Sequence, residues 1–196
     1  MPKQLIAIPP LSILIFLTSS CLVAGQVISS GQCRTDITYL SKVDFKALQG
    51  SWYMQMRYKL KHDGNYRCQK TDYKLGPNNE HLVTNSEIRN KGGSERFTKG
   101  KLTFLKDGQY TIEYDDPSAI PFKYKTLSLD STKYVIIYIC KNLPNNKHAE
   151  LVSIHTRERG PSKEVKRDVK LAIAALKDQK INTRALKPVT QKKCTN

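Results

Sequence analysis

The stretch of sequence that decides the fold is Gly50-Ser-Trp-Tyr-Met-Gln-Met-Arg-Tyr58. Large apolar or aromatic side chains stand at every second position from the tryptophan onward, a period that is typical of a β-strand with one buried face. The residues expected on that face are Trp52, Met54, Met56 and Tyr58. The turn signal His62-Asp-Gly-Asn65 then ends the strand.

Further strand-like segments follow through the middle of the chain. They are separated by turn signals, of which Gly76-Pro-Asn-Asn79, Gly92-Gly93 and Asp107-Gly108 are the strongest. The segments after the first one are Cys68–Leu75, His81–Ile88, Phe97–Phe104, Gln109–Tyr114, Phe122–Leu129, Tyr134–Ile139 and Ala149–His155. Eight short strands joined by turns predict an all-β antiparallel sandwich or barrel.

The pattern becomes helical between Ser162 and Lys180, with Ser162 as the expected N-cap. Apolar residues recur there at helical spacing, with charged residues on the opposite face. The apolar stripe consists of Val165, Val169, Ala172, Ile173 and Leu176. A membrane-surface helix is the alternative interpretation, but the stripe is narrow and lacks aromatic residues. We therefore expect the helix to pack against the outside of the sheet.

Residues 1–25 have the pattern of a secretory signal peptide. A basic start at Lys3 precedes an apolar run that includes Leu11–Leu17, and small residues follow at Ala24 and Gly25. Cleavage there leaves residues 26–196 as a single domain of a secreted protein. No second apolar run approaches the ~20 residues that span a bilayer, so no membrane span is expected.

The cysteines that remain after this cleavage are Cys33, Cys68, Cys140 and Cys194. An even number in an exported chain implies two disulfides, for which spacing alone leaves three connectivities open. There is no Cys-x-x-Cys pair to suggest a zinc ribbon or thioredoxin chemistry. We therefore expect these cysteines to be structural.

The chain is strongly basic: 33 Lys and Arg against 17 Asp and Glu give a formal net charge of +16. The basic residues are spread along the strands and the helix, so the exterior could attract anionic surfaces such as cells, glycans or lipids. An anionic ligand would be favoured if Lys99, Lys101, Lys123 and Lys125 stood at the mouth of a barrel. Nucleic acid is not an expected partner, and there is no phosphate-binding loop motif.

Four parts of the chain carry a recognisable combination of motifs. Val43–Tyr53, which contains Gly50-Ser-Trp52, resembles the Gly-x-Trp opening of the lipocalin family, and Asn65–Tyr73 resembles the second strand of its apolipoprotein D and bilin-binding branch. Asp130–Cys140 resembles the second lipocalin motif, and Arg157 stands where the third motif places an arginine beside the tryptophan. The layout is most similar to the apolipoprotein D and insect bilin-binding (Lazarillo-like) branch, and it also resembles triatomine salivary lipocalins.

This resemblance implies an eight-stranded antiparallel up-and-down barrel with one C-terminal α-helix packed on the outside. One end would be closed by Trp52, and the other end would be the ligand mouth. The structural motif residues carried over are Gly50, Trp52, Asp130, Tyr134 and Arg157. Similarity to insect members implies the disulfides Cys33–Cys140 and Cys68–Cys194.

Alternation along the expected strands predicts the inner wall of such a barrel, although a slip of one residue would reverse the face of a strand. The candidate ligand-binding residues are Met54, Met56, Tyr58, Tyr73, Val83, Asn85, Glu87, Phe97, Tyr110, Ile112, Tyr114 and Tyr124. A wall rich in aromatic residues and methionine, with few polar groups, suits a mostly apolar ligand. The alternative is that these side chains simply fill a small barrel.

The expected function is that of a secreted carrier that reversibly binds a small hydrophobic ligand, such as a lipid, sterol, pheromone or tetrapyrrole. The alternative is a salivary-type lipocalin that sequesters an anionic or amphipathic agonist, or blocks a host protein through its basic surface. The sequence has no nucleophile elbow or metal-spaced cluster, so we expect neither an enzyme nor a cofactor.

Haem ligation is not expected either. By resemblance, the haem-binding histidine would fall in mid-strand near Asn85 or Ser86. None of His62, His81, His148 and His155 falls there, and we interpret them as surface or strand positions.

Overall fold

The computed structural model describes residues 27–59, 65–116 and 122–194. The expected signal peptide and most of the turn signal at 62–65 lie outside these residues. The strands in the described residues are β1 (Val27–Ser30), β2 (Gly50–Tyr58), β3 (Tyr66–Leu75), β4 (His81–Arg89), β5 (Glu95–Phe104), β6 (Gln109–Tyr114), β7 (Lys123–Asp130), β8 (Tyr134–Leu143), β9 (Lys147–Thr156) and β10 (Leu186–Pro188). All eight predicted strands are present, and the short β1 and β10 are additions that the sequence did not predict.

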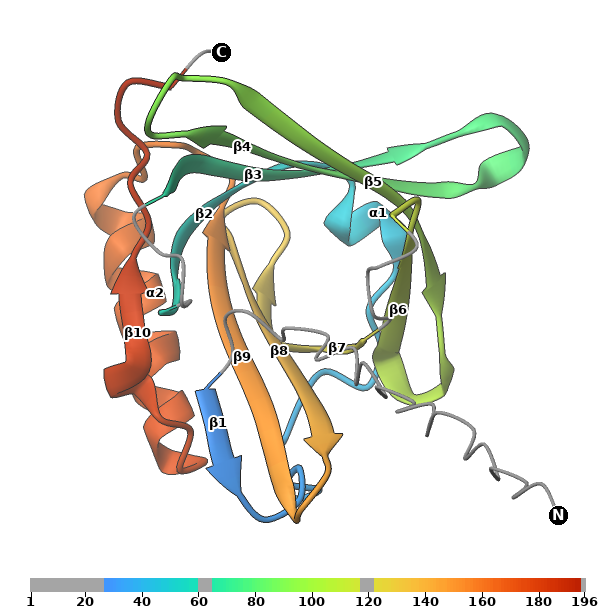
Figure 1. Cartoon of the computed structure of the whole chain (residues 1–196), viewed down its shortest axis with the longest axis vertical. Coiled ribbons are helices and arrows are strands. Elements are labelled where there is room, and N and C mark those ends of the chain that lie inside the picture. Colours follow the sequence, from blue (N-terminus) through green and yellow to red (C-terminus); the bar gives the residue numbers. More distant parts are fainter. Residues whose placement is uncertain (1–26, 60–64, 117–121, 195–196) are drawn as a thin grey trace, which may run out of the picture.

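Strands β2 to β9 form a closed antiparallel barrel (Figure 1). Each strand pairs with the next along the chain, and β9 also pairs with β2, so the sheet has no free edge between them. Short turns make this order possible. Between β5 and β6, Asp107 and Gly108 both have positive φ, 64° and 72°, as tight hairpin turns require. The predicted barrel is therefore confirmed, and the sandwich alternative is excluded.

Helix α2 (Lys163–Asp178) lies on the outside of the barrel, next to β10 (Figure 1). It begins as predicted, because the Ser162 hydroxyl accepts a hydrogen bond from the backbone amide of Val165 at 3.2 Å. Its apolar stripe packs on outward side chains of β8 and β9, where Ile136 and Ile154 are fully buried. The barrel wall is thus covered by a second core on this side. Among the described helices, none is long and apolar enough to cross a membrane.

A β-bulge in β2 changes which side chains face the interior. The pairing of β2 with β9 shifts register between Met54 and Met56, and an extra residue of this kind reverses the faces that follow it. Trp52 therefore belongs to the inner core, whereas Met56 and Tyr58 pack in the outer cluster with α2. This corrects the prediction that Met56 and Tyr58 face the ligand site.

One end of the barrel is closed around Trp52, which has no exposed surface. Its indole Nε1 donates to the carbonyl of Leu48 at 2.6 Å, at the end of the short helix α1 (Phe45–Leu48). The guanidinium carbon of Arg157 lies 3.6 Å from the centre of the indole ring. Arg157 also donates to the carbonyls of Gln49 and Ser131, both at 2.8 Å. The stacking that the resemblance implied is present.

The remaining motif residues shape the backbone at the same closed end. Gly50 has a φ of +99°, and a Cβ there would lie only 3.0 Å from Nη1 of Arg157. The carboxylate of Asp130 accepts from the amide and the hydroxyl of Thr132, at 2.9 and 2.7 Å, within the turn before β8. The Tyr134 hydroxyl lies 3.1 Å from that of Ser128. Their roles here are structural.

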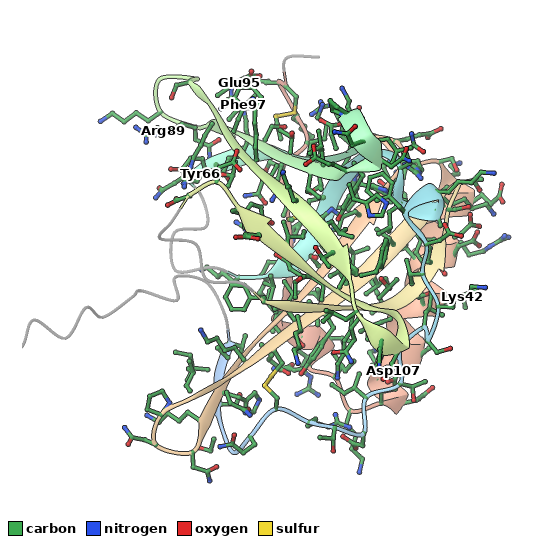
Figure 2. All side chains as sticks on the ribbon, turned by 90° about the vertical axis from the view of Figure 1, so that its right-hand side faces the viewer. Lys42, Tyr66, Arg89, Glu95, Phe97 and Asp107 are labelled. Atoms are coloured by element: carbon green, nitrogen blue, oxygen red, sulfur yellow. A yellow bond between two sulfur atoms is a disulfide. The ribbon has the colours of Figure 1, made fainter. Side chains whose placement is uncertain are left out.

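Both disulfides implied by the resemblance are formed, Cys33–Cys140 and Cys68–Cys194, and they appear as yellow bonds in Figure 2. The second bridge holds residues 189–194, here called the C-terminal seam, between β2 and β3. The amide of Val189 donates to the carbonyl of Gln55, and the amide of Cys68 donates to that of Thr190, each at 2.8 Å. Direct pairing of β2 with β3 is limited to residues 50–53 and 70–73, so the seam completes this part of the wall.

Candidate ligand-binding site

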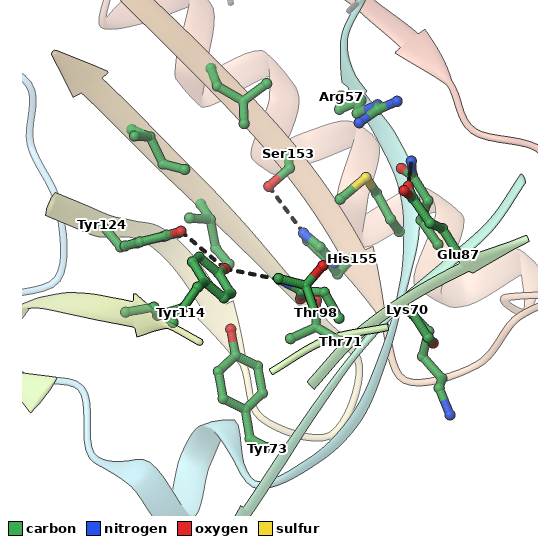
Figure 3. A pocket seen from close by; sticks show the side chains of 18 of the residues that line it. Arg57, Lys70, Thr71, Tyr73, Glu87, Thr98, Tyr114, Tyr124, Ser153 and His155 are labelled. Carbon is green, nitrogen blue, oxygen red and sulfur yellow. Dashed lines mark hydrogen bonds between the residues drawn. The ribbon is translucent and has the colours of Figure 1, made fainter. Parts of the chain in front are cut away.

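A cavity of about 450 Å³ lies inside the barrel, beyond the packed end at Trp52 (Figure 3). Every strand from β2 to β9 contributes at least one side chain to it. The barrel is therefore hollow, which argues against the alternative in which tyrosine and methionine side chains fill it.

Most of the predicted ligand-binding residues lie at this cavity. The period of two residues places inward side chains correctly on β3, β4 and β6, and on β2 up to its bulge. The predicted residues that line the cavity are Met54, Tyr73, Asn85, Glu87, Ile112, Tyr114 and Tyr124. They form a wall with both apolar and hydrogen-bonding surface.

Val83 and Tyr110 also belong to the inner core but do not line the cavity. They are almost fully buried in the same cluster as Trp52. The ring of Tyr110 stacks on that of Tyr124 with 5.1 Å between ring centres. These two residues form the floor beneath the cavity, so they can support the ligand site without lining it.

The prediction for Phe97 needs correction, because its side chain lies on the outer face of β5 and is 57% exposed. It lies near Glu95, close to the end of the β4–β5 hairpin (Figure 2). The neighbouring residues Arg96 and Thr98 line the cavity instead. The inward face of β5 carries even-numbered residues, and Leu102 continues it into the core.

Sequence reasoning missed the part of the wall that β8 and β9 supply, namely Ile137, Ile139, Leu151, Ser153 and His155. Residues 135–139 are all hydrophobic because both faces of β8 are buried, one in the barrel and the other against the cluster that includes α2. Alternation of apolar and polar residues therefore cannot show which of them face inward. On β9, Val152 and Ile154 pack outward against the α2 cluster, and the more polar side chains point inward. Because α2 covers the outer face of β9, the outward residues there are apolar and polar residues such as Ser153 face the cavity, which is the opposite of the usual pattern.

A chain of hydrogen bonds crosses the cavity wall from β3 to β7. The Thr71 hydroxyl donates to Oδ1 of Asn85 at 2.7 Å, and Nδ2 of Asn85 donates to the hydroxyl of Tyr114 at 2.9 Å. The hydroxyls of Tyr114 and Tyr124 lie 3.3 Å apart (Figure 3). Burial raises the pKa of both phenols, so they stay protonated near neutral pH.

Charged side chains of both signs occur among the lining residues, and several are paired. Glu87 accepts from Nε2 of Gln69 at 3.0 Å and lies 3.7 Å from Arg96. The ammonium of Lys70 lies 2.9 Å from Asp72. Lys99, Lys101, Lys123 and Lys125 do not line the cavity. The suggestion that these four lysines select an anionic ligand at the mouth therefore has no support from their position.

His155 is the one histidine among the lining residues and is only 4% exposed. Its Nε2 lies 3.0 Å from the Ser153 hydroxyl. Burial, with a further contribution from the charge of Arg57, lowers the pKa of His155 to about 4. The imidazole is thus neutral in the folded protein near neutral pH.

This lowered pKa predicts a pH dependence of stability. The unfolded chain takes up a proton near pH 6.5 and the folded one only near pH 4, so stability is complete above pH 6.5 and falls as pH drops toward 4. Between pH 7 and pH 5 the wild type should lose about 2 kcal/mol more than a His155→Gln variant. Urea unfolding at both pH values measures this difference. Equal losses in the two proteins would show that His155 is not held neutral.

The fold and the cavity together define a closed antiparallel β-barrel with an internal cavity. Among solved structures, it is similar to insecticyanin from the tobacco hornworm Manduca sexta, with a TM-score of 0.71 at 19% identity over 84% of this chain and 89% of that one. It is also similar to lobster apocrustacyanin A1, with a TM-score of 0.65 at 18% identity over 84% and 91%. The cockroach allergen Per a 4 gives 0.64 at 19% identity over 81% and 94%. At such identities the likeness shows the fold alone.

The sequence itself establishes the family. Residues 49–193 match the model of the Lipocalin / cytosolic fatty-acid binding protein family. The chain belongs to this family. No curated protein matches the sequence.

Proposed function

We propose that this protein is a secreted, non-catalytic carrier that reversibly binds a small hydrophobic ligand inside its barrel. The observation that carries the proposal is the cavity of about 450 Å³. Trp52 and Arg157 close one end of the barrel, and Ile137, Ile139 and Leu151 give the cavity an aliphatic wall.

The size of the cavity agrees with this role, because ligand pockets commonly measure about 300–1,000 Å³. Burying ~300 Å² of apolar ligand surface contributes roughly 7 kcal/mol before the cost of association is subtracted. Micromolar affinity therefore needs polar contacts as well. The hydroxyls and the amide of the Thr71–Asn85–Tyr114–Tyr124 chain are placed to supply them.

Two disulfides support an extracellular location, since such bridges persist in oxidising compartments, and the expected signal peptide would direct export. The pairing Cys33–Cys140 and Cys68–Cys194 also supports membership of the apolipoprotein D and bilin-binding branch. A role of the basic exterior in attracting anionic surfaces stays a prediction.

Two adjacent residues of β5 allow a matched test of the site. Thr98 lines the cavity, whereas Phe97 points outward. A Thr98→Trp variant should fill part of the cavity and weaken binding of an apolar fluorescent dye, N-phenyl-naphthylamine, at least about tenfold, because the ring takes the space of the ligand. A Phe97→Trp variant should bind the dye as the wild type does. Fluorescence titration measures both dissociation constants.

Failure of the wild type to bind the dye, or any member of a broad panel of lipids and sterols in competition, would count against the carrier role. Equal weakening by both tryptophans would place the dye outside the barrel. Independently of the dye, mass spectrometry of the small molecules that co-purify with the natively secreted protein would identify its ligand directly.

A further inference from the structure

The hydrogen-bond chain at the cavity has a direction. The Asn85 amide accepts from Thr71 through Oδ1 and presents Nδ2, which is only a donor, to the Tyr114 hydroxyl. Tyr114 therefore cannot pass its own proton back to Asn85. The chain can continue only through the contact of 3.3 Å between the hydroxyls of Tyr114 and Tyr124.

Counting protons along this chain leaves one over. Tyr114 and Tyr124 together carry two hydroxyl protons, and the single hydrogen bond between them uses one, whichever residue donates. Burial keeps both phenols protonated, as their raised pKa values indicate. One phenolic O–H is thus available at the cavity, and a buried donor of this kind is costly unless a partner accepts its proton.

From this count we infer that the natural ligand carries a hydrogen-bond-acceptor oxygen, such as a carbonyl or an ether, which takes the remaining proton of the Tyr114–Tyr124 pair. The inference rests on the proposed carrier function and names the class of ligand: apolar molecules with an acceptor oxygen, as opposed to pure hydrocarbons.

The position of the pair places that oxygen beside the packed floor of the cavity. Tyr124 stacks directly on Tyr110, which is fully buried in the floor. Figure 3 shows the hydroxyls of Tyr114 and Tyr124 pointing toward one another. Ile137 and Ile139 line the cavity on β8, the strand next to Tyr124, and offer apolar surface to the rest of the molecule. A ligand whose oxygen accepts from the pair therefore has apolar wall beside that oxygen for the rest of the molecule.

The test compares a medium-chain methyl ketone with the terminal alkene in which a methylene group replaces the carbonyl oxygen. The two molecules have nearly the same shape, so the difference between them isolates the acceptor. Each displaces the bound dye N-phenyl-naphthylamine from the wild type, from the variants Tyr114→Phe and Tyr124→Phe, and from the double variant. Tyr39→Phe is the control, because it removes a phenol whose hydroxyl accepts from Gln109 and that does not line the cavity.

The proton count makes an unusual prediction for these variants. Either single variant still has one phenolic proton, no longer used within the pair, so the ketone keeps its affinity within about twofold. The double variant has none, and its affinity for the ketone should fall about three- to tenfold more than its affinity for the alkene. Tyr39→Phe should change neither affinity.

Equal responses of ketone and alkene to the double substitution would overturn the inference while leaving the carrier function intact. That result is also expected if the Asn85 amide were reversed, since the chain would then consume both phenolic protons. Loss of dye binding by the wild type would instead contradict the proposed function itself.

A second measurement uses the wild-type protein alone, so it does not depend on whether a variant folds. The infrared carbonyl stretch of the ketone, isotopically labelled at the carbonyl carbon, should shift to lower wavenumber on binding to the wild-type protein, relative to the ketone in hexane. A hydrogen bond to the oxygen weakens the C=O bond and causes this shift. A frequency equal to that in hexane would show that no donor reaches the oxygen and would overturn the inference.

Discussion

Replacing Trp52 with alanine is expected to lower the free energy of unfolding by about 3–5 kcal/mol. The side chain is fully buried in the inner core, together with Leu48 and Tyr73, so its removal leaves a void in the closed end of the barrel. The change also removes the donor to the Leu48 carbonyl and the ring on which the Arg157 guanidinium lies. An unsatisfied buried carbonyl adds to the cost of the void.

The adjacent Tyr53 provides the matched control. It is partly buried on the outer face of β2, where the guanidinium carbon of Arg159 lies 4.7 Å from the centre of its ring. Tyr53→Ala removes an aromatic ring from the same strand but leaves the closed end intact, so it should cost less than half as much. Urea unfolding followed by circular dichroism suits both variants, because Trp52 is the only tryptophan in the chain. Equal losses for the two variants would mean that Trp52 is an ordinary wall residue.

Part of the closed end could be predicted from the sequence because it is local, whereas the contact of Arg157 with Trp52 joins distant residues and was implied by the resemblance to lipocalins. Gly50 and Trp52 are two residues apart in the sequence. The turn residues and the helix N-cap Ser162 likewise affect only backbone a few positions away. Strand alternation extended this success to β3, β4 and β6. On these strands the predicted residues, which stand at every second position, meet the cavity or the floor, although neighbouring residues such as Lys70 and Ser86 also line the cavity.

The errors in the predicted site arose where a distant element sets the face of a strand. The bulge between Met54 and Met56 exists in the pairing of β2 with β9, about a hundred residues away, and no local pattern marks it. On β5, Phe97 and Phe104 are seven residues apart and so cannot share one face of a regular strand. Leu102 and Phe104 were the better guide to the inward phase. His155 was missed because α2 buries the other face of β9.

The two disulfides lead to a further prediction with a large effect. Each bridge joins residues far apart in the chain, with separations of 107 for Cys33–Cys140 and 126 for Cys68–Cys194. Because the constraint on the unfolded chain grows only slowly with loop length, removing either bridge by paired Cys→Ala substitutions should cost about 2–5 kcal/mol. Urea unfolding of the two double variants measures these losses, which should be similar.

The local consequences of removing the two bridges should differ, because only the Cys68–Cys194 bridge is attached to the C-terminal seam. Without the Cys68–Cys194 bridge, residues 189–194 are held beside β2 and β3 mainly by backbone and side-chain hydrogen bonds, such as those from Gln191 to the carbonyls of Met54 and Gln69. The amides of residues 68 and 189 should then exchange with solvent much faster than in the wild type, whereas loss of Cys33–Cys140 should leave them protected. Since the seam completes the wall between β2 and β3, its release should also speed ligand dissociation. Unchanged exchange at both amides after removal of the Cys68–Cys194 bridge would show that hydrogen bonds alone hold the seam in place.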